Sequence, residues 1–370
     1  MTALADRFYA IRDRVAASPR FQRFAARFPL TRPVATRQAS AVFDLCAGFV
    51  YAQILRAAVD LQLLERLQAR PRLPADLAPE LELTEAATIR LLKATTSLGL
   101  TASRSGGRYG LGMKGAALLG NPGALRMIEH HHLLYADLVD PVRLLRGEAG
   151  RTALQDYWGY AVSERPESNL RVEEYSRLMA ASLSLVVEDV LAAYPFAGHR
   201  VMLDIGGGTG GFIRAVAAAV PDLQFQLFDL PPVCALAGPR FAEAGIGNRV
   251  TRIPGNARLG PMPGGADLAT LIRVLHDHDD EDAQAILHGA FAALPPGGTL
   301  LIAEPMSGQK GAEAMADAYF GFYLLAMGSG RARRPEEIRA MLETAGFGGI
   351  RTLAMPRALL ASAMVARKPA

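Results

Sequence analysis

Cysteine is scarce in this sequence, which holds only Cys46 and Cys234 among 370 residues. The two cysteines lie far apart and form no Cys-x-x-Cys pair, which excludes a zinc ribbon and a scaffold held together by disulfides. Half of the residues are hydrophobic, so a sizeable core can form without metal ions or crosslinks. The cysteine content therefore indicates a reducing, intracellular compartment.

Long apolar runs are missing as well. The first 25 residues mix acidic and basic side chains around no apolar core, so no secretory signal is expected. The most apolar early stretch, residues 45–59, contains Gln53 and Arg56 and is too short to span a bilayer. We therefore expect a soluble, cytoplasmic chain.

Acidic residues are few in the first 40 positions, which hold eight arginines but only Asp6 and Asp13. Phe21, Phe24 and Phe28 lie between these arginines. A basic, aromatic, helix-compatible segment can lie on an anionic membrane, stay solvated, or cross onto a partner subunit, and the sequence leaves these alternatives open. No other basic face with stacking aromatics follows, so nucleic-acid binding is not expected.

The first 105 residues have an almost wholly helical pattern. Residues 84–100 predict a helix with Thr84 as its N-cap and Gly99 at its end. The polar stretch 103–112 then has the composition of a hairpin. Helices followed by a small hairpin indicate a winged-helix unit, and further helices are expected over residues 123–193.

From residue 200 onward, strand-like and helical segments alternate, which is typical of a parallel, doubly wound sheet. A helix is expected at 212–220, and the last segment, 361–368, is expected to add an antiparallel strand at the edge of the sheet. The predicted parallel strands are 200–207, 225–230, 268–275 and 299–305.

The most informative segment is DIGGGTGGF, residues 204–212, where glycines permit close approach of a ligand to the backbone and to a helix N-terminus. Gly206, Gly208 and Gly211 satisfy the Gly-x-Gly-x-x-Gly pattern of nicotinamide-binding folds. The alternative is the glycine loop of an S-adenosylmethionine (SAM) methyltransferase. Asp204 favours SAM, because a carboxylate there can meet a cationic aminoacyl group but would repel a pyrophosphate.

Asp229 ends the apolar strand at 225–230, at the sheet edge where such folds bind their ligands. A carboxylate in that place can accept both hydroxyl groups of a ribose. Because NAD and SAM sites share this device, Asp229 indicates a nucleoside without choosing between them.

His276 ends a later strand at the same edge and can therefore reach the cleft. A neutral imidazole can take a hydroxyl proton while a methyl group arrives. The neighbouring His and Asp residues invite a metal site, but adjacent positions give no coordinating geometry, so no metal is expected. Residues 279–282 are expected to form a capped, acidic first turn of the next helix.

Three further histidines, His130, His131 and His132, are consecutive. On a helix they point about 100° apart and cannot all face one ion, so no role is assigned to them.

Taken together, the motifs resemble those of SAM-dependent O-methyltransferases of the hydroxyindole and caffeate type. The chain carries them in order: DIGGGTGG, FDLP, GNA (255–257), RVLHD (273–277) and LPPGGTLLIAEP (294–305). The front segments 18–33 and 43–55 are similar to the branch of that family formed by the demethylspheroidene (hydroxyneurosporene) O-methyltransferases of purple phototrophic bacteria.

This resemblance implies a helical, winged-helix-like dimerisation domain, a Rossmann-like α/β catalytic domain and a homodimer. The implied domains are a basic helical arm at 1–40, the dimerisation domain at 41–120, a helical connector that contributes to the substrate site at 121–195, and the SAM-binding domain at 196–370.

The resemblance also assigns site residues, with His276 as catalytic base and Glu304 as a carboxylate that fixes its tautomer. Asn256 falls where relatives have an aspartate beside the adenine, and Arg273 matches a basic position that contacts the cofactor. The residues implied in SAM binding are Asp204, Gly206, Gly208, Asp229, Leu230, Asn256, Ala257 and Arg273.

Three departures from the family pattern stand out. Ala332 replaces a second glutamate that flanks the catalytic histidine, so another group has to substitute for it or Glu304 has to suffice. His278 replaces a tryptophan, which changes local packing. The helix at 319–327 is unusually apolar and places Met327 where an asparagine often lies; it is either ordinary core or the wall of a lipophilic tunnel.

The sequence thus predicts a SAM-dependent O-methyltransferase for a large apolar acceptor, in particular the tertiary hydroxyl of a 1-hydroxycarotenoid in the spheroidene pathway. Within the class, a small hydroxylated aromatic or a polyketide is the alternative acceptor. Outside it, the alternatives are an NAD-dependent dehydrogenase and a SAM-binding regulator without chemistry, for which Ala332 is the best support.

Overall fold

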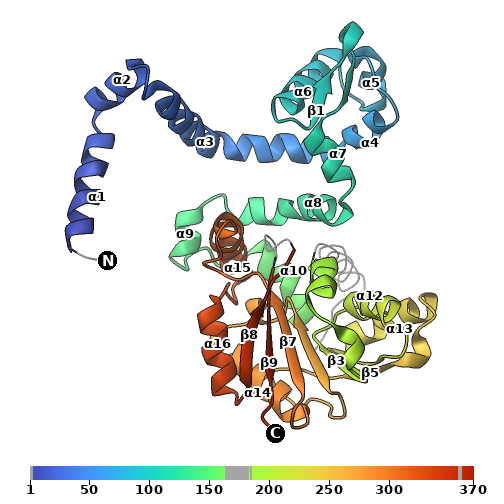
Figure 1. The fold of residues 1–370 in the computed structure, drawn as a ribbon. Helices are drawn as coiled ribbons and strands as arrows, with labels where there is room; N and C mark the ends of the chain where they lie inside the picture. The colour runs from blue at the N-terminus through green and yellow to red at the C-terminus, as the bar shows by residue number, and fades with distance from the viewer. Residues whose placement is uncertain (1–2, 163–182, 184–185, 357–360) are drawn as a thin grey trace. The chain divides into compact units, whose positions relative to one another are not determined.

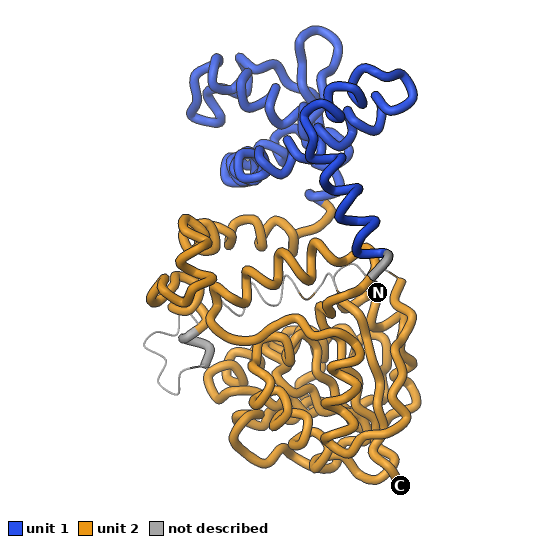
Figure 2. The backbone as a smooth tube through the Cα atoms, turned by 90° about the vertical axis from the view of Figure 1, so that its left-hand side faces the viewer, with its two compact units in different colours: residues 1–119 blue, residues 120–370 orange. Residues whose placement is uncertain are grey.

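The computed structural model describes residues 3–162, 183, 186–356 and 361–370. The chain divides into two compact units, Met1–Leu119 and Gly120–Ala370 (Figure 2). Part of the helical connector expected before residue 195 lies outside the described residues.

The first unit is helical apart from one hairpin. Apolar side chains at helical spacing, among them Leu63, Leu67 and Leu77, form its small core. The N-cap prediction is confirmed, because the Thr84 hydroxyl accepts the Ala87 N–H at 3.2 Å. The elements are α1 (Ala3–Ala16), α2 (Pro19–Arg27), α3 (Arg32–Asp60), α4 (Leu63–Gln68), α5 (Pro74–Glu80), α6 (Glu85–Ser97), the antiparallel pair β1 (Thr101–Ser103) and β2 (Tyr109–Leu111), and α7 (Met113–Leu119).

Helix α3 corrects the expectation that the early apolar stretch is too short to span a bilayer. Its 29 residues extend well before residue 45, and by length and composition alone the helix is able to cross a membrane. It also runs through residue 40, so no break in the backbone marks the end of the basic arm.

The second unit is built on a seven-stranded sheet in the order β5-β4-β3-β6-β7-β9-β8 (Figure 1). Parallel pairing joins β5 through β7, and β9 and β8 are antiparallel additions. The strands are β3 (Val201–Ile205), β4 (Gln224–Asp229), β5 (Val250–Pro254), β6 (Leu268–Ile272), β7 (Thr299–Glu304), β8 (Gly348–Leu353) and β9 (Ser362–Arg367).

The expected C-terminal strand is antiparallel, as predicted, but it is not an edge strand. β9 lies between β7 and β8, and β8 occupies the edge. Five of the six residues of β9 are buried, which explains its continuous apolar sequence.

Helices cover both faces of this sheet (Figure 1). One face packs against α12 (Gly211–Ala219) and α13 (Pro231–Glu243), and the other against α14 (Asp280–Ala293) and α16 (Pro335–Thr344). The expected Rossmann-like, doubly wound architecture is thereby confirmed.

A further group of helices packs around its own apolar cluster, which includes Leu154, Trp158 and Tyr323. Side chains of Trp158 and Met327 place this group beside the carboxyl ends of the parallel strands. Its members are α8 (Pro122–Asp137), α9 (Pro141–Leu145), α10 (Ala153–Val162), a π-helical segment (Ala314–Phe320) and α15 (Gly321–Met327).

Candidate active site

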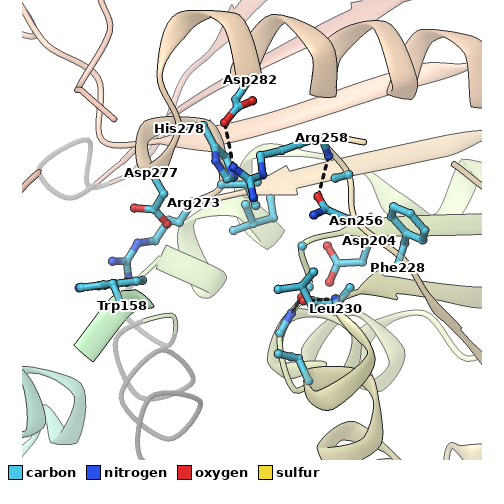
Figure 3. Close-up of a pocket in the computed structure, with 18 of the residues that line it drawn as sticks. Trp158, Asp204, Phe228, Leu230, Asn256, Arg258, Arg273, Asp277, His278 and Asp282 are labelled. Carbon is cyan, nitrogen blue, oxygen red and sulfur yellow. Dashed lines mark hydrogen bonds and ion pairs between the residues drawn. The ribbon is translucent and has the colours of Figure 1, made fainter. Parts of the chain in front are cut away.

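A cavity of about 370 Å³ lies at the carboxyl ends of β3, β4 and β6 in the second unit. Figure 3 shows Asp204, Leu230 and Asn256 at one end, and Asp277, Arg273 and Trp158 at the other. All the residues predicted to bind SAM line this cavity: Asp204, Gly206, Gly208, Asp229, Leu230, Asn256, Ala257 and Arg273.

The glycine loop joins β3 to α12 and needs glycine for its backbone. Gly206 and Gly208 have φ values of 66° and 60°, in the left-handed region that side chains disfavour. A Cβ at Gly208 would touch nothing within 4 Å, so this position leaves open space. The loop is held by the Gly208 N–H, which donates to Asp229 Oδ2 at 2.7 Å.

Asp204 is the last polar side chain of β3 and is almost completely buried, with 1% of its surface exposed. Its Oδ1 accepts the Thr270 hydroxyl at 2.7 Å, whereas Oδ2 has no hydrogen-bond partner among the described residues. Burial raises the pKa of this carboxyl to about 7. An orphaned carboxylate oxygen in a cavity suits a cationic group of a ligand.

Asp229 ends β4, and its two oxygens accept the N–H groups of Gly208 and Leu230, each at 2.7 Å. Burial raises the pKa of the Asp229 carboxyl to about 6 in spite of these two bonds. The Asp229 carbonyl accepts the Gly255 N–H at 2.9 Å, which sets the start of the next loop. In that loop Asn256 Oδ1 accepts the Arg258 N–H at 3.0 Å.

His276 follows β6 and lies between carboxylates. Its Nδ1 is 2.5 Å from Glu304 Oε2, and its Nε2 is 3.2 Å from Asp277 Oδ1. Glu304, at the end of β7, is fixed because its Oε1 accepts the N–H groups of Val274 and Leu275, both at 2.8 Å. The structure thus joins His276 to Glu304, as the sequence predicts, but neither residue is among those that line the described cavity.

Burial by itself would lower the pKa of His276, but Asp277 and Glu304 outweigh burial and raise it. The carboxylate of Asp277 lies beside Nε2, on the side of the ring opposite Glu304, and it helps to raise this pKa. Sequence reasoning missed this role, although Asp277 directly follows His276 in the RVLHD motif.

Arg333 is the second residue that sequence reasoning missed. It is 2% exposed and donates to the carbonyls of Leu275 and His278, at 2.6 and 2.7 Å, and to Asp280. Arg333 thus holds, from the outside, the loop that carries His276. Its neighbour Ala332 supplies no carboxylate to this loop. The only sequence signal was the basic stretch GRARR at 330–334.

The three consecutive histidines bond to three different partners. His130 shares a hydrogen bond with the Tyr323 hydroxyl, and His131 shares one with the Tyr319 hydroxyl, each at 2.8 Å. His132 is hydrogen-bonded to the Glu129 carbonyl of its own helix. Burial lowers the pKa of His130 to about 4, so its ring is neutral near pH 7. No cluster of three or more potential metal ligands occurs in the part of the chain that the structure describes.

Comparison with known proteins identifies the family. Residues 135–348 match the O-methyltransferase domain, and residues 43–121 match the O-methyltransferase dimerisation domain. The chain belongs to the O-methyltransferase family. The dimerisation domain also identifies the chain as a subunit of a homodimer, and the similarity to its relatives indicates a small-molecule substrate.

Two curated relatives are demethylspheroidene O-methyltransferases. The protein of Cereibacter sphaeroides is 40% identical over 96% of this chain and 94% of its own length. That of Rhodobacter capsulatus is 40% identical over 90% of this chain and 83% of its own. Among solved structures, a methyltransferase of calicheamicin biosynthesis in its SAH-bound form is 26% identical, with a TM-score of 0.74 over 90% of this chain and 99% of that one.

The O-methyltransferase is SAM-dependent, as predicted, and the NAD-dependent dehydrogenase considered from the glycine pattern is ruled out. The cavity fits SAM in one decisive respect, because the partnerless Oδ2 of Asp204 suits the amino group of the methionyl part. A pyrophosphate in the same place would meet a carboxylate.

Proposed function

We propose that this O-methyltransferase methylates the tertiary hydroxyl of a 1-hydroxycarotenoid in the spheroidene pathway. The observation that supports this proposal best is the 40% identity to demethylspheroidene O-methyltransferase over 96% of the chain. The cavity adds support, because Trp158 and Met327, which pack in one apolar cluster, line it with apolar surface.

SAM supplies the methyl group from its sulfonium. We assign its amino group to Asp204 and its ribose hydroxyls to Asp229, two carboxylates of the cavity lining that are close enough to interact electrostatically. The N–H of Leu230, by bonding to Asp229, keeps that carboxylate in place. Asn256 and Ala257 flank the adenine in this assignment, and Arg273 stands nearer the acceptor.

Catalysis then rests on positioning and on proton removal. Holding the two reactants in line accounts for about 7–11 kcal/mol in well-oriented reactions. A tertiary alcohol is a weak acid, so its proton has to leave during methyl transfer. We assign this proton to His276, with Glu304 fixing the ring through Nδ1 at 2.5 Å. Such general-base catalysis contributes about 10²–10⁴-fold.

The size of the cavity bears on the acceptor. The cavity volume of about 370 Å³ is in the range of sites for one small ligand. This volume is too small to hold a nucleoside together with a whole carotenoid. In this proposal only the hydroxylated end of the acceptor enters, and most of the hydrocarbon stays outside.

The test is a panel of acceptors incubated with purified protein and labelled SAM. Hydroxycarotenoids in detergent should be methylated, and catechols, hydroxyindoles and hydroxylated polyketides should react at least ~100-fold more slowly, because their hydroxyl groups do not match an apolar end group. Faster methylation of an aromatic would replace the carotenoid by that acceptor. Absence of methylation with every acceptor would favour a SAM-binding regulator.

We further propose that the enzyme works in the cytoplasm at the face of an anionic membrane, where a carotenoid resides. Residues 1–40 carry eight arginines and two aspartates, and almost all of their described side chains are exposed. Phe21 and Phe24 on α2 and Phe28 at its C-cap are exposed and lie between arginines, as in helices that lie in a membrane interface.

A further inference from the structure

A chain of three buried side chains joins helices α8, α15 and α10 behind one wall of the cavity. His130 Nε2 lies 2.8 Å from the Tyr323 hydroxyl, and the indole N–H of Trp158 donates to the same hydroxyl at 3.2 Å. The three residues are 8% exposed or less, although His130 and Tyr323 are 193 positions apart. Of the three, Trp158 lines the described cavity, at the same end as Asp277 and Arg273 (Figure 3).

The hydrogen bonds in this chain run in one direction. An indole N–H can only donate, so the oxygen of Tyr323 accepts it. Burial lowers the pKa of His130 to about 4, so near pH 7 its ring is neutral and has one nitrogen without a proton. Because a buried hydroxyl that donated to nothing would lose a hydrogen bond, the Tyr323 hydroxyl donates to Nε2 of His130. The chain therefore runs from the cavity wall inward to His130.

This chain fixes the plane of an apolar surface. The indole of Trp158 is held through its N–H, and the Tyr323 ring supports it edge-on, at 6.3 Å between centroids and 90° between planes. Met327 lies one helical turn after Tyr323 on α15, belongs to the same apolar cluster as Trp158 and lines the same cavity. A large rigid ring that cannot turn holds an apolar group in one place, which is what methyl transfer in line requires.

We propose that Trp158 determines acceptor specificity by seating the branched apolar end of the alcohol, and that His130 is a positioning residue that fixes the indole through Tyr323. The inference rests on the proposed methylation of an apolar alcohol at this site. It gives one of the three consecutive histidines a role behind the cavity wall. A neutral imidazole suits this role, because a cation buried behind an apolar wall would be costly without a counter-charge.

The test compares the wild type with His130→Leu, His130→Gln and Tyr323→Phe. Leucine removes the acceptor at the end of the chain, whereas the amide oxygen of glutamine can take the place of Nε2. Tyr323→Phe breaks both hydrogen bonds and keeps the ring. The matched control is His131→Leu, which breaks a bond of the same length to Tyr319, a residue that is not among the described residues lining the cavity.

Fluorescence measures directly whether the indole is fixed. Trp158 is the only tryptophan of the chain, so the tryptophan emission of the full-length dimer reports on this one side chain. With SAH bound, the anisotropy of this emission should fall in His130→Leu and Tyr323→Phe, because the indole gains rotational freedom. It should keep the wild-type value in His130→Gln and His131→Leu.

Kinetics measure whether the fixed indole matters for the reaction. In His130→Leu and Tyr323→Phe, kcat should fall about 10- to 100-fold, the range that misplacement of a reactant produces. The acceptor KM should change little, because Trp158 still supplies its apolar area, and the affinity for SAM should match the wild type. Trp158→Ala should lose at least as much kcat and should also raise the acceptor KM, whereas His130→Gln and His131→Leu should stay close to the wild type.

Two outcomes would overturn the positioning role of His130: unchanged anisotropy in His130→Leu, or equal kinetic losses in the glutamine and leucine variants. A lower melting temperature of His130→Leu with an unchanged kcat would reduce this histidine to a core residue. Wild-type kcat and KM in Trp158→Ala would overturn the contact with the acceptor.

Wild-type turnover of the hydroxycarotenoid decides the proposed function separately. The anisotropy depends on no acceptor, and the kinetic ratios use whichever alcohol the wild type methylates fastest. The positioning of the indole is therefore tested even where the hydroxycarotenoid is not the acceptor.

Discussion

At the scale of single residues, we expect Asp204 to couple SAM binding to pH. Its folded-state pKa of about 7 lies above the ordinary 3.8, so the free protein holds a proton there at pH 6 that the unfolded chain has lost. This group therefore lowers the stability of the free protein as pH rises from about 4 to 7. An ammonium group binds only the ionised form, so SAM affinity should fall about tenfold per pH unit below pH 7.

Titration calorimetry between pH 6 and 8 checks this prediction. Asp204→Asn is the matched variant, because its amide oxygen can still accept the Thr270 hydroxyl. It should bind SAM more weakly at pH 8 and show a flatter dependence between pH 6 and 7. A wild-type affinity that stays constant over this range would contradict the link between Asp204 and the amino group.

The sequence was sufficient to find residues whose function depends on local spacing. The glycine loop and Asp229 come from one strand–turn–helix unit and the strand after it, so a short window contains the pattern. Asp277 and Arg333 were missed for different reasons. Asp277 lies beside His276 in sequence, but its direction into the cavity is set by the fold. Arg333 contacts Leu275 across 58 positions, a distance that no local pattern spans.

At the scale of elements, residues 328–334 clasp the loop that carries His276. Ser329 donates to the Asp277 carbonyl at 3.1 Å, and the Gly330 N–H donates to Asp279 at 2.8 Å. Arg333 adds its two carbonyl contacts from a buried position. Asp279, expected as a helix cap, therefore serves the contact between two loops, although α14 does begin with the predicted acidic turn.

Arg333→Ala should lower kcat by about 10- to 100-fold. The hydrogen bonds from its charged side chain hold the loop that carries His276, and such bonds contribute about 1.5–3 kcal/mol. Arg331→Ala is the matched control, since Arg331 bonds the same Asp280 but is 44% exposed. That exposed pair should change kcat by about twofold or less. Steady-state kinetics with a hydroxycarotenoid, together with thermal melts, separates the two.

An equal loss in both variants would show that the contact with Asp280 matters and the carbonyl contacts do not. A fall in melting temperature of Arg333→Ala without any change in kcat would make Arg333 a purely structural residue.

Element prediction succeeded where burial makes strands continuously apolar. β3, β6 and β7 fall within the predicted segments. In the edge strands β5 and β8, about half of the residues are exposed to solvent. Their sequences are therefore not continuously apolar, and both strands escaped prediction. The position of β9 depends on β8 outside it, so its own sequence could not tell an inner antiparallel strand from an edge.

At the scale of the whole molecule, the arginine-rich arm should direct the enzyme to membranes. Deletion of residues 1–35 should abolish flotation with anionic liposomes while the dimer and SAM binding persist. Each basic residue near such a surface contributes about 1 kcal/mol, so attachment should also weaken as salt rises. Flotation assays at low and high salt, with size-exclusion chromatography, check the expectation.

A charge variant keeps the helix and tests the cause. Replacing Arg20, Arg23 and Arg27 of α2 by glutamine should reduce flotation nearly as far as the deletion does. If the truncated protein floats like the full chain, or separates into monomers, the arm belongs to the dimer and not to the lipid surface.

Helix α3 has one more consequence, which concerns how far an electric field reaches. Its 29 residues make a rod about 43 Å long. That is roughly four Debye lengths at 0.1 M salt. Charges near the first turn of α3 are therefore screened from the apolar core that packs against its last turn. The electrostatic potential around the arm is therefore independent of the electrostatic potential at the helical core of this unit, whatever the arm touches. Ionic strength can therefore tune attachment of the arm without retuning the charges that hold that core together.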